Sequence, residues 1–308
     1  MSNSSTQAAA AAPAADPRAH RGTIHLEDAT VLAHDHLAGE QHIIRVESPV
    51  IAAHALPGQF VHLRCDEGLP MRRPMSIMRS GGEAGWLDVL YKAHGTGTAL
   101  LARRQVGEQL STLGPIGQPF KLEGYRRRPL LLGGGVGIPP MIYLAEHMVK
   151  TGANCAPLVL MASEVPFPFT ARPAQIIVDT MPPGTIACMP MLDDWGVANR
   201  LASMQGYPGC YQGLITDLAR HWLDEMPESE RDAIEIYACG PTPMLKAVQA
   251  LAAEYALPAW LSLEEYMACA VGGCAGCVVE VKTPDGPAMK RVCVDGPVFD
   301  AASIVFPA

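Results

Sequence analysis

Four cysteines near the end of the 308-residue chain constrain its fold more tightly than any other feature. Cys269, Cys274 and Cys277 follow the spacing C-x4-C-x2-C, and Cys293 comes after fifteen further residues. Three ligands on one short loop with a fourth on a separate segment is the arrangement of plant-type 2Fe–2S sites. The spacing therefore predicts an iron–sulfur cluster ligated by these four cysteines.

The residues around the cysteines fit such a cluster. Gly272, Gly273 and Gly276 allow tight turns that direct backbone N–H groups toward sulfur. The fourth ligand is expected on the strand MKRVCVDGP, after a strand and hairpin turn in VVEVKTPDG. Zinc is the alternative, but structural zinc sites usually pair their cysteines as two C-x2–4-C units, whereas here the fourth cysteine stands alone. A visible absorption spectrum separates the two, since zinc protein is colourless.

Composition excludes several classes of protein. A hydrophobic content of 49% with 18% charged residues is typical of a well-packed globular chain. The net charge of −8 argues against binding to nucleic acid, which needs a basic face. No run of eighteen apolar residues is present, so no membrane-spanning helix is expected.

The first residues and the remaining cysteines point to a cytoplasmic protein. Residues 1–20 are rich in Ala, Ser and Pro and lack the charged start and apolar core of a secretory signal, so we expect a disordered tail. Nine cysteines are an odd count that suits a disulfide framework poorly. We expect the isolated ones to be buried thiols in a reducing compartment: Cys65, Cys155, Cys188 and Cys210.

The hydrophobic pattern divides the rest of the chain into three parts. Residues 21–124 contain six short runs rich in branched and aromatic residues, which predict a six-stranded antiparallel β-barrel. Residues 125–262 alternate strand and helix patterns, from PLLLGGG and IPPMIYLAEHMVK through AQIIVDT to AWLSLE, and predict a doubly wound parallel α/β domain. Residues 263–308 form a small third domain around the cysteines.

Two motifs in the first part suit a flavin. Arg73-Pro74-Met75-Ser76 lies on a predicted strand and offers a cation for a diphosphate and a hydroxyl for N5 or O4 of an isoalloxazine ring. Further on, HGTGTALLARR supplies Gly97 and Thr98, with Thr98 expected to begin a helix whose N-terminus faces an anion. Each motif is weak when taken alone.

The α/β part carries a glycine-rich turn after its first strand. LLLGGGVGIPP departs from G-x-G-x-x-G, because Ile138 stands at the last glycine position. Its glycines still leave room for a pyrophosphate at the start of the following helix: Gly133, Gly134, Gly135 and Gly137. A second strand ends in Cys239-Gly240-Pro241, whose cysteine taken alone reads as a buried thiol.

The order of these motifs resembles the ferredoxin–NADP reductase superfamily over residues 22–262. The resemblance implies FAD on the barrel and a nicotinamide dinucleotide at the glycine-rich loop, with Ser76 and Cys239 beside the reacting rings. It implies that two barrel segments line the flavin: Arg73, Pro74, Met75 and Ser76, and Leu90, Tyr91 and Lys92. It also implies that the turn of Gly97 and Thr98 holds the pyrophosphate of the flavin. Cys239, Gly240 and Pro241 would lie under the nicotinamide. The strand end Ser163-Glu164-Val165 lacks the cation that a 2′-phosphate needs, which favours NAD, although Arg172 follows.

The cluster segment narrows the resemblance. MACAVGGCAGCVVEVKTPDG and KRVCVDGPVFDA, with RRPMSI, GTGT and LGPIG, resemble the electron-transfer subunits of type B dihydroorotate dehydrogenase, the NAD-linked enzyme of pyrimidine synthesis. The resemblance implies a partner with FMN that oxidises dihydroorotate, in a heterotetramer. Electrons would pass from FMN through the 2Fe–2S cluster to FAD and leave as hydride to NAD⁺.

Other functions fit parts of the pattern. The flavin subunit of a sulfhydrogenase or of a ferredoxin:NADP transhydrogenase has the same architecture and a different partner. A redox sensor of transcription would need a DNA-binding element, and the sequence has neither a basic stripe nor a helix-turn-helix pattern. His34 and His36 form an H-x-H pair on a predicted strand, and five more histidines cluster loosely in the barrel region: His20, His25, His42, His54 and His62. We expect all of these to be surface or core histidines.

Overall fold

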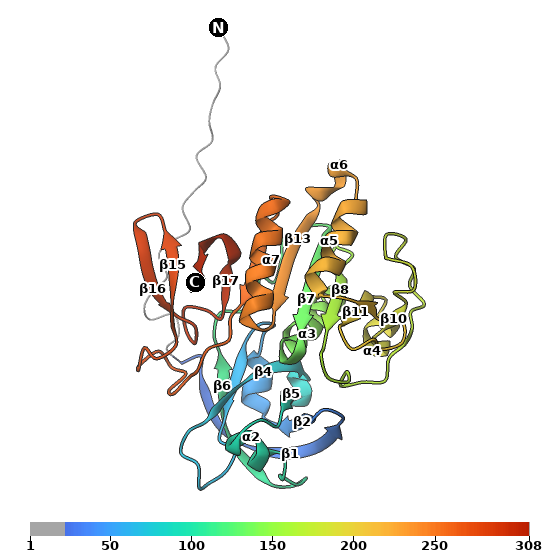
Figure 1. The fold of residues 1–308 in the computed structure, drawn as a ribbon. Helices are drawn as coiled ribbons and strands as arrows, with labels where there is room; N and C mark the ends of the chain where they lie inside the picture. The colour runs from blue at the N-terminus through green and yellow to red at the C-terminus, as the bar shows by residue number, and fades with distance from the viewer. Residues whose placement is uncertain (1–21, 308) are drawn as a thin grey trace.

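The structure is a computed structural model that describes residues 22–307 as three connected parts (Figure 1). The barrel comes first, the layered α/β part follows, and the cysteine-bearing segment lies beside both. The predicted tail, residues 1–20, falls outside the described residues. Within residues 22–307, none of the helices combines the length and the apolar character needed to cross a membrane.

The first part is the predicted closed barrel of six antiparallel strands, in the order β1-β2-β5-β4-β3-β6. Alternate side chains of these strands point inward and form one apolar core, as closure of a barrel requires. Two short helices, Pro49–His54 (α1) and Thr96–Leu101 (α2), connect strands. The strands are His25–Leu37 (β1), Gln41–Glu47 (β2), Phe60–Leu63 (β3), Arg73–Ser80 (β4), Trp86–Lys92 (β5) and Gln109–Ile116 (β6).

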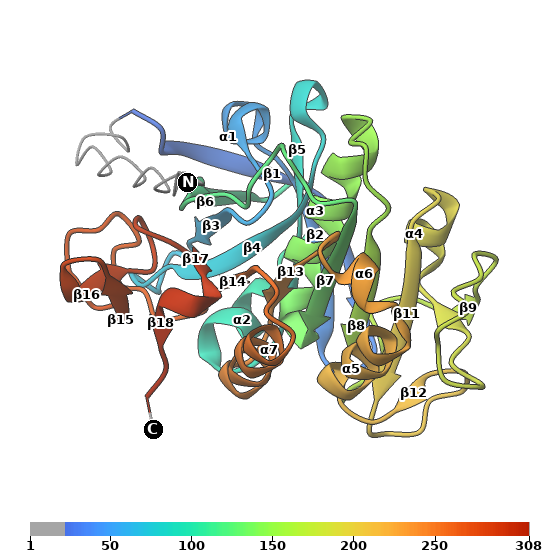
Figure 2. The same ribbon diagram turned by 90° about the horizontal axis from the view of Figure 1, so that it is seen from above.

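The second part is a seven-stranded sheet in the order β12-β11-β8-β7-β13-β14-β17, parallel except for its last strand. Helices α5 and α7 cover one face and α3 and α4 the other, each face with its own apolar core, which confirms the doubly wound fold (Figure 2). The strands are Arg128–Gly134 (β7), Leu158–Ala162 (β8), Ala198–Ser203 (β11), Tyr211–Gln212 (β12), Ile234–Cys239 (β13), Ala259–Ser262 (β14) and Val298–Asp300 (β17). The helices are Ile138–Lys150 (α3), Pro190–Asp194 (α4), Ile215–Glu225 (α5), Glu228–Arg231 (α6) and Thr242–Glu254 (α7).

The alternation predicted for residues 174–203 is wrong in one place. AQIIVDT, expected to continue the sheet, forms no regular element and exposes 81% of Ile177. The next sheet strand is β11. Between β8 and β11 the chain forms the short helix α4 and a two-residue ribbon of Arg172–Pro173 (β9) with Ala187–Cys188 (β10). The sequence of β11, ANRLAS, lacks the apolar pattern of a buried strand, so the strand was not predicted.

The third part begins with the cysteine loop and continues as a small antiparallel sheet of Val278–Thr283 (β15), Gly286–Arg291 (β16) and Ile304–Val305 (β18). Between β16 and β18 the chain forms β17, which pairs antiparallel with β14 at the edge of the large sheet. The cysteine segment is therefore hydrogen-bonded to the α/β part.

A buried ion pair joins the barrel to the α/β part. Arg79 of β4 donates to Glu146 of α3 with Nη2 2.7 Å from Oε1, and the Glu146 side chain is only 4% exposed. Lys150 adds a second contact to the same carboxylate at 3.0 Å. Because Glu146 is cut off from water, these cations offset the cost of burying its carboxylate.

We expect Glu146→Gln to destabilise the protein by about 2–3 kcal/mol. Breaking a fully buried pair costs ~3–5 kcal/mol, and Arg79 keeps some solvent contact. Thermal unfolding measures the loss. Glu254→Gln is the matched control, because it removes an exposed partner of Arg220 and should cost no more than ~1 kcal/mol. Equal effects of the two substitutions would contradict a structural role for the Glu146 pair.

Candidate functional site

The predicted flavin residues, except Gly97, line a cavity of about 1180 Å³ where the three parts of the chain meet. Arg73, Pro74, Met75 and Ser76 of β4 and Leu90, Tyr91 and Lys92 of β5 form its barrel side, with Thr98 beyond them. Residues that sequence reasoning missed form the remaining walls, because no local pattern marks them: Val136 and Thr242 from the α/β part, and Glu264, Tyr266, Met267 and Gly276 from the cysteine segment.

Two adjacent arginines of the barrel have different tasks. Arg72 donates to the Ser111 hydroxyl at 2.8 Å and to the His62 carbonyl at 3.2 Å, which ties neighbouring barrel strands together. Arg73 donates only to the carbonyls of Met71 and Arg72, at 3.0 and 3.1 Å, and no carboxylate among residues 22–307 forms an ion pair with it. The Arg73 guanidinium thus brings an uncompensated positive charge to the cavity, as a diphosphate requires.

The start of α2 leaves room for this arginine. A Cβ at Gly97 would lie 3.0 Å from Nε of Arg73, so the glycine leaves room for the guanidinium. The helix begins at Thr96 and not at Thr98 as predicted. Instead, the Thr98 hydroxyl donates to the His94 carbonyl at 2.8 Å and accepts from the His94 N–H at 2.7 Å, which closes the turn.

The glycine-rich loop lies at the carboxyl end of β7, where ligands of open α/β sheets bind. Gly137 packs against the end of β13, and a Cβ there would lie 2.3 Å from the carbonyl oxygen of Cys239. A Cβ at Gly134 or at Gly240 would meet the Met244 sulfur at 2.4 and 2.6 Å. These close approaches bring the loop and CGP together.

Cys239 itself is fully buried at the end of β13 and is absent from the residues that line the cavity. Burial raises the pKa of its thiol well above the ordinary value, with the Glu264 charge adding to the shift. The cavity wall next to it is formed by Pro241 and Thr242. Contact between Cys239 and a nicotinamide stays a prediction.

The four predicted cluster ligands meet as two pairs of neighbouring thiols, Cys269 with Cys274 and Cys277 with Cys293. Cys277 and Cys293 are 3% and 1% exposed, whereas Cys274 is on the surface. Such a donor set suits a binuclear centre in which each iron takes two thiolates, and it fits a 2Fe–2S cluster.

The cysteine loop also stabilises negative charge on sulfur. The N–H of Cys274 lies 3.4 Å from the Cys269 sulfur, and the N–H of Gly276 lies 3.4 Å from the Cys274 sulfur. Burial opposes ionisation of Cys269, but N–H groups of Val271, Cys274 and Gly273 outweigh it and lower the pKa of the thiol to about 7. Donors aimed at the sulfurs are the surroundings that a cluster needs.

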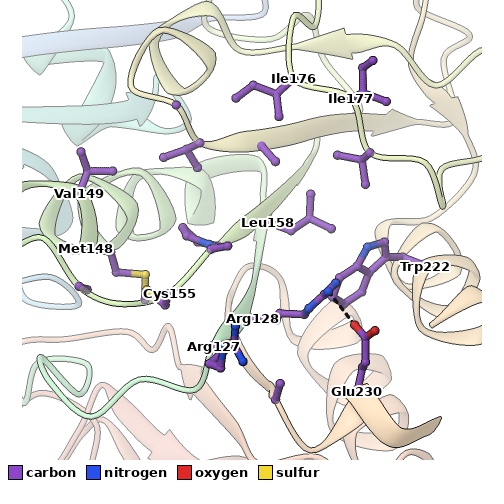
Figure 3. A pocket seen from close by; sticks show the side chains of 18 of the residues that line it. Arg127, Arg128, Met148, Val149, Cys155, Leu158, Ile176, Ile177, Trp222 and Glu230 are labelled. Atoms are coloured by element: carbon purple, nitrogen blue, oxygen red, sulfur yellow. Dashed lines mark ion pairs between the residues drawn. The ribbon is translucent and has the colours of Figure 1, made fainter. Parts of the chain in front are cut away.

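A second cavity, of about 920 Å³, lies at the opposite, amino-terminal edge of the parallel sheet (Figure 3). Arg128 and Glu230 form an ion pair of 2.6 Å at its side, with Trp222 and Leu158 nearby. The predicted site residues are absent from its lining. Because open α/β sheets bind ligands at the other edge, we assign it no part in the site.

Comparison with known proteins finds a matching family model and similar relatives. Residues 264–305 match the family model described as the iron–sulfur cluster binding domain of dihydroorotate dehydrogenase B. The chain is 33% identical over 280 residues to the "dihydroorotate dehydrogenase B (NAD(+)), electron transfer subunit" of Shouchella clausii, with 90% of this chain and 96% of the relative covered. The protein of the same name from Geobacillus thermodenitrificans is 32% identical over 283 residues, with coverage of 91% and 98%.

Solved structures share the fold. An NADH-dependent reduced ferredoxin-NADP oxidoreductase, described in connection with flavin-based electron bifurcation, is 25% identical with a TM-score of 0.72, covering 91% of this chain and 90% of that chain. A ferredoxin NADP⁺ reductase from Neisseria gonorrhoeae with bound FAD and NADP is 14% identical with a TM-score of 0.57, covering 76% and 92%. The second likeness concerns the fold alone.

Two glycines of one loop make a matched pair for testing the packing of the site. Gly137→Ala places a methyl group against backbone atoms of Cys239 and Gly240 that cannot move, so we expect it to displace the loop and lower the thermal unfolding midpoint. Gly135→Ala meets nothing within 4 Å and bears only the strain of a φ of +54°, about 1–2 kcal/mol. A Gly137 variant as stable as the Gly135 variant would contradict the close contact.

Proposed function

The chain belongs to the family of electron-transfer subunits of NAD⁺-dependent dihydroorotate dehydrogenase B, and we propose that it carries electrons from a dihydroorotate-oxidising partner to NAD⁺ in pyrimidine synthesis. One observation carries the proposal: the cysteine loop forms a wall of the cavity that holds the predicted flavin residues. A one-electron centre and a flavin need such closeness to exchange electrons. The chain has no need to bind dihydroorotate itself.

FAD is the flavin that we assign to this cavity. When bound, it exchanges single electrons with the cluster and a hydride with the nicotinamide, which only a flavin can combine. Arg73 neutralises its diphosphate, Gly97 leaves the room that the Arg73 guanidinium needs, and Thr98 lines the same cavity. Ser76 offers a hydroxyl from β4 to the edge of the ring system.

NAD⁺ is the expected acceptor rather than NADP⁺. Glu164 follows β8 at the same sheet edge as the glycine-rich loop, and its carboxylate accepts from the Gln205 amide at 3.0 Å. A carboxylate there suits a ribose diol and repels a 2′-phosphate. Arg172 is the nearby cation that, from the sequence, could have bound a 2′-phosphate. It is already paired with Asp193 and Asp194.

We assign the cysteine loop to the interface with the catalytic subunit. Cys274 lies on the surface, and the same loop exposes 95% of Tyr266 and 47% of Val271. Exposed apolar side chains beside a redox centre are what a partner would cover. The partner is expected to carry FMN and to form a heterotetramer with this chain.

The compartment follows from the thiols. The five cysteines outside the cluster site form no disulfide. Free thiols in this number persist in a reducing compartment. We therefore place the protein in the cytoplasm.

A second assembly is kept open by the likeness to the ferredoxin-NADP oxidoreductase, whose flavin subunit would have the same architecture and another donor. The relatives with 33% and 32% identity favour the dihydroorotate dehydrogenase complex. The partner that co-purifies with the chain decides between the two assemblies.

The proposed electron path predicts that two activities can be separated. In Cys274→Ser we expect NADH oxidation by ferricyanide to persist, because it needs only the flavin and nicotinamide sites. Orotate-dependent NADH oxidation with the catalytic subunit should fall by at least about 100-fold, because the cluster loses a ligand. Steady-state rates of the reconstituted complex measure both activities.

The control is Cys155→Ser, which changes an isolated, half-buried thiol and should leave both activities unchanged. Visible absorption should show loss of the cluster only in the Cys274 variant. If the wild-type chain forms no complex with the dihydroorotate dehydrogenase of the same organism, the assignment to pyrimidine synthesis is wrong.

Dinucleotide selectivity tests the role of Glu164. We expect Glu164→Gln to reduce the preference for NADH over NADPH by about tenfold in kcat/KM, since a hydrogen bond to a charged group is worth ~1.5 kcal/mol or more. Arg172→Gln should leave the preference unchanged, because its charge is already neutralised. A lower NADPH activity in the Arg172 variant alone would reverse the assignment.

A further inference from the structure

Three histidines meet at the end of the hairpin formed by β1 and β2. His36 and His42 are direct cross-strand partners, and His34 lies two residues before His36 and therefore on the same face. One ring nitrogen from each of the three lies within 4.8 Å of those of the others. The H-x-H pair, expected from sequence to be surface or core histidines, thus gains a third imidazole from the neighbouring strand.

The ring of His34 is held in one orientation. Its Nδ1 lies 2.9 Å from the carbonyl oxygen of Arg104, which can only accept, so Nδ1 carries the proton. Nε2 then carries the lone pair, and it accepts from the hydroxyl of Tyr91 at 2.8 Å. A histidine that donates one ring N–H to a backbone carbonyl and presents the other nitrogen is the arrangement found at metal sites.

His42 supplies an independent observation. Its side chain is 94% buried, being 6% exposed, and neither ring nitrogen has a hydrogen-bond partner among residues 22–307. Leaving a buried polar atom without a partner costs about 1–3 kcal/mol, so such atoms usually have one. The ring faces His36 at 4.8 Å between centroids and stacks on Tyr91 at 5.1 Å.

We propose that His34, His36 and His42 form a three-imidazole site for one divalent transition-metal ion, with Zn²⁺ as its preferred occupant. Zinc takes three histidine nitrogens at ~2.0–2.1 Å, which separates tetrahedral ligands by about 3.4 Å. The observed separations need only a small closure of the three side chains. The ion would supply the buried nitrogen of His42 with a partner. Ca²⁺ and Mg²⁺ are excluded because they prefer oxygen ligands.

The site is distinct from the cysteine cluster and from the flavin cavity. None of its three histidines lines that cavity, but Tyr91 contacts both. Coordination by Nε2 of His34 removes the hydrogen-bond acceptor of the Tyr91 hydroxyl. Metal binding at the hairpin therefore changes a contact of β5, the strand that carries Tyr91. The expected role is to fix the end of the barrel next to the flavin.

The test uses the full-length chain with its iron–sulfur cluster and flavin loaded, titrated with ZnCl₂ in a calorimeter. We expect one Zn²⁺ per chain and a zinc absorption-edge spectrum with nitrogen neighbours. His36→Ala should weaken binding by at least about 100-fold, the upper end of what loss of even an outer partner costs. Because His36 is exposed, its removal should leave the metal-free protein as stable as the wild type.

His25→Ala is the matched control, since it removes a histidine of the same strand whose ring contacts only His54 among the described aromatic rings. It should bind Zn²⁺ as the wild type does, and Zn²⁺ should raise the unfolding midpoint of both but not of His36→Ala. Sulfur neighbours in the zinc spectrum, binding unchanged in His36→Ala, or no binding to the wild type would each overturn the proposal.

Discussion

The short strand β17 is the constraint on which the site depends. Its backbone pairs antiparallel with β14 at the edge of the large sheet, and just before it Pro297 accepts from the N–H of Leu263 at 2.9 Å. One residue earlier, the carbonyl of Gly296 accepts from the N–H of Gln118, which follows the last barrel strand, at 2.6 Å. A single extended segment thus binds the barrel and the sheet at once. Together with the packing of Cys277 and Cys293 in the core of the α/β part, it fixes the cysteine loop as a wall of the cavity.

The sequence predicts those parts of the fold whose side chains match their surroundings. The barrel strands and α3 are apolar on the faces they bury, so their patterns were sufficient. Strand β11 was missed because three of its five buried residues are polar. Asn199 is fully buried with Oδ1 accepting from the Met189 N–H at 2.7 Å, and Arg200 donates to the carbonyls of Thr185 and Ile176. Those carbonyls belong to the irregular segment over the sheet, so the polar groups of the strand and of this segment are hydrogen-bonded to each other. No pattern within one segment reveals such an exchange.

The site residues, like the elements of the fold, include some that the sequence predicts and some that it does not. Spacing alone predicts the cysteine ligands, because a cluster restricts where its ligands stand in the chain. It cannot distinguish Arg72 from Arg73, since both line the cavity and only the fold shows that Arg72 is also hydrogen-bonded to the Ser111 hydroxyl. Nor can it reveal the wall formed by Met267 and Gly276, which depends on how a distant segment docks. The histidine trio shows the same limit, because only the register of β1 with β2 places His42 opposite His36.

The cysteines differ in burial, so the loop has one side against the rest of the chain and one side toward solvent. Cys277 and Cys293 pack in the apolar core shared with the α/β part, whereas Cys274 faces solvent beside exposed Tyr266. A one-electron relay has to be approached from two directions, by its donor and by its acceptor. In this chain the acceptor side is fixed by the fold, through the Met267 and Gly276 wall, and the donor side is left for another protein. A cluster placed inside the barrel would lose access to a partner, and one on a free tail would lose the flavin. Attachment through β17 at the sheet edge satisfies both requirements.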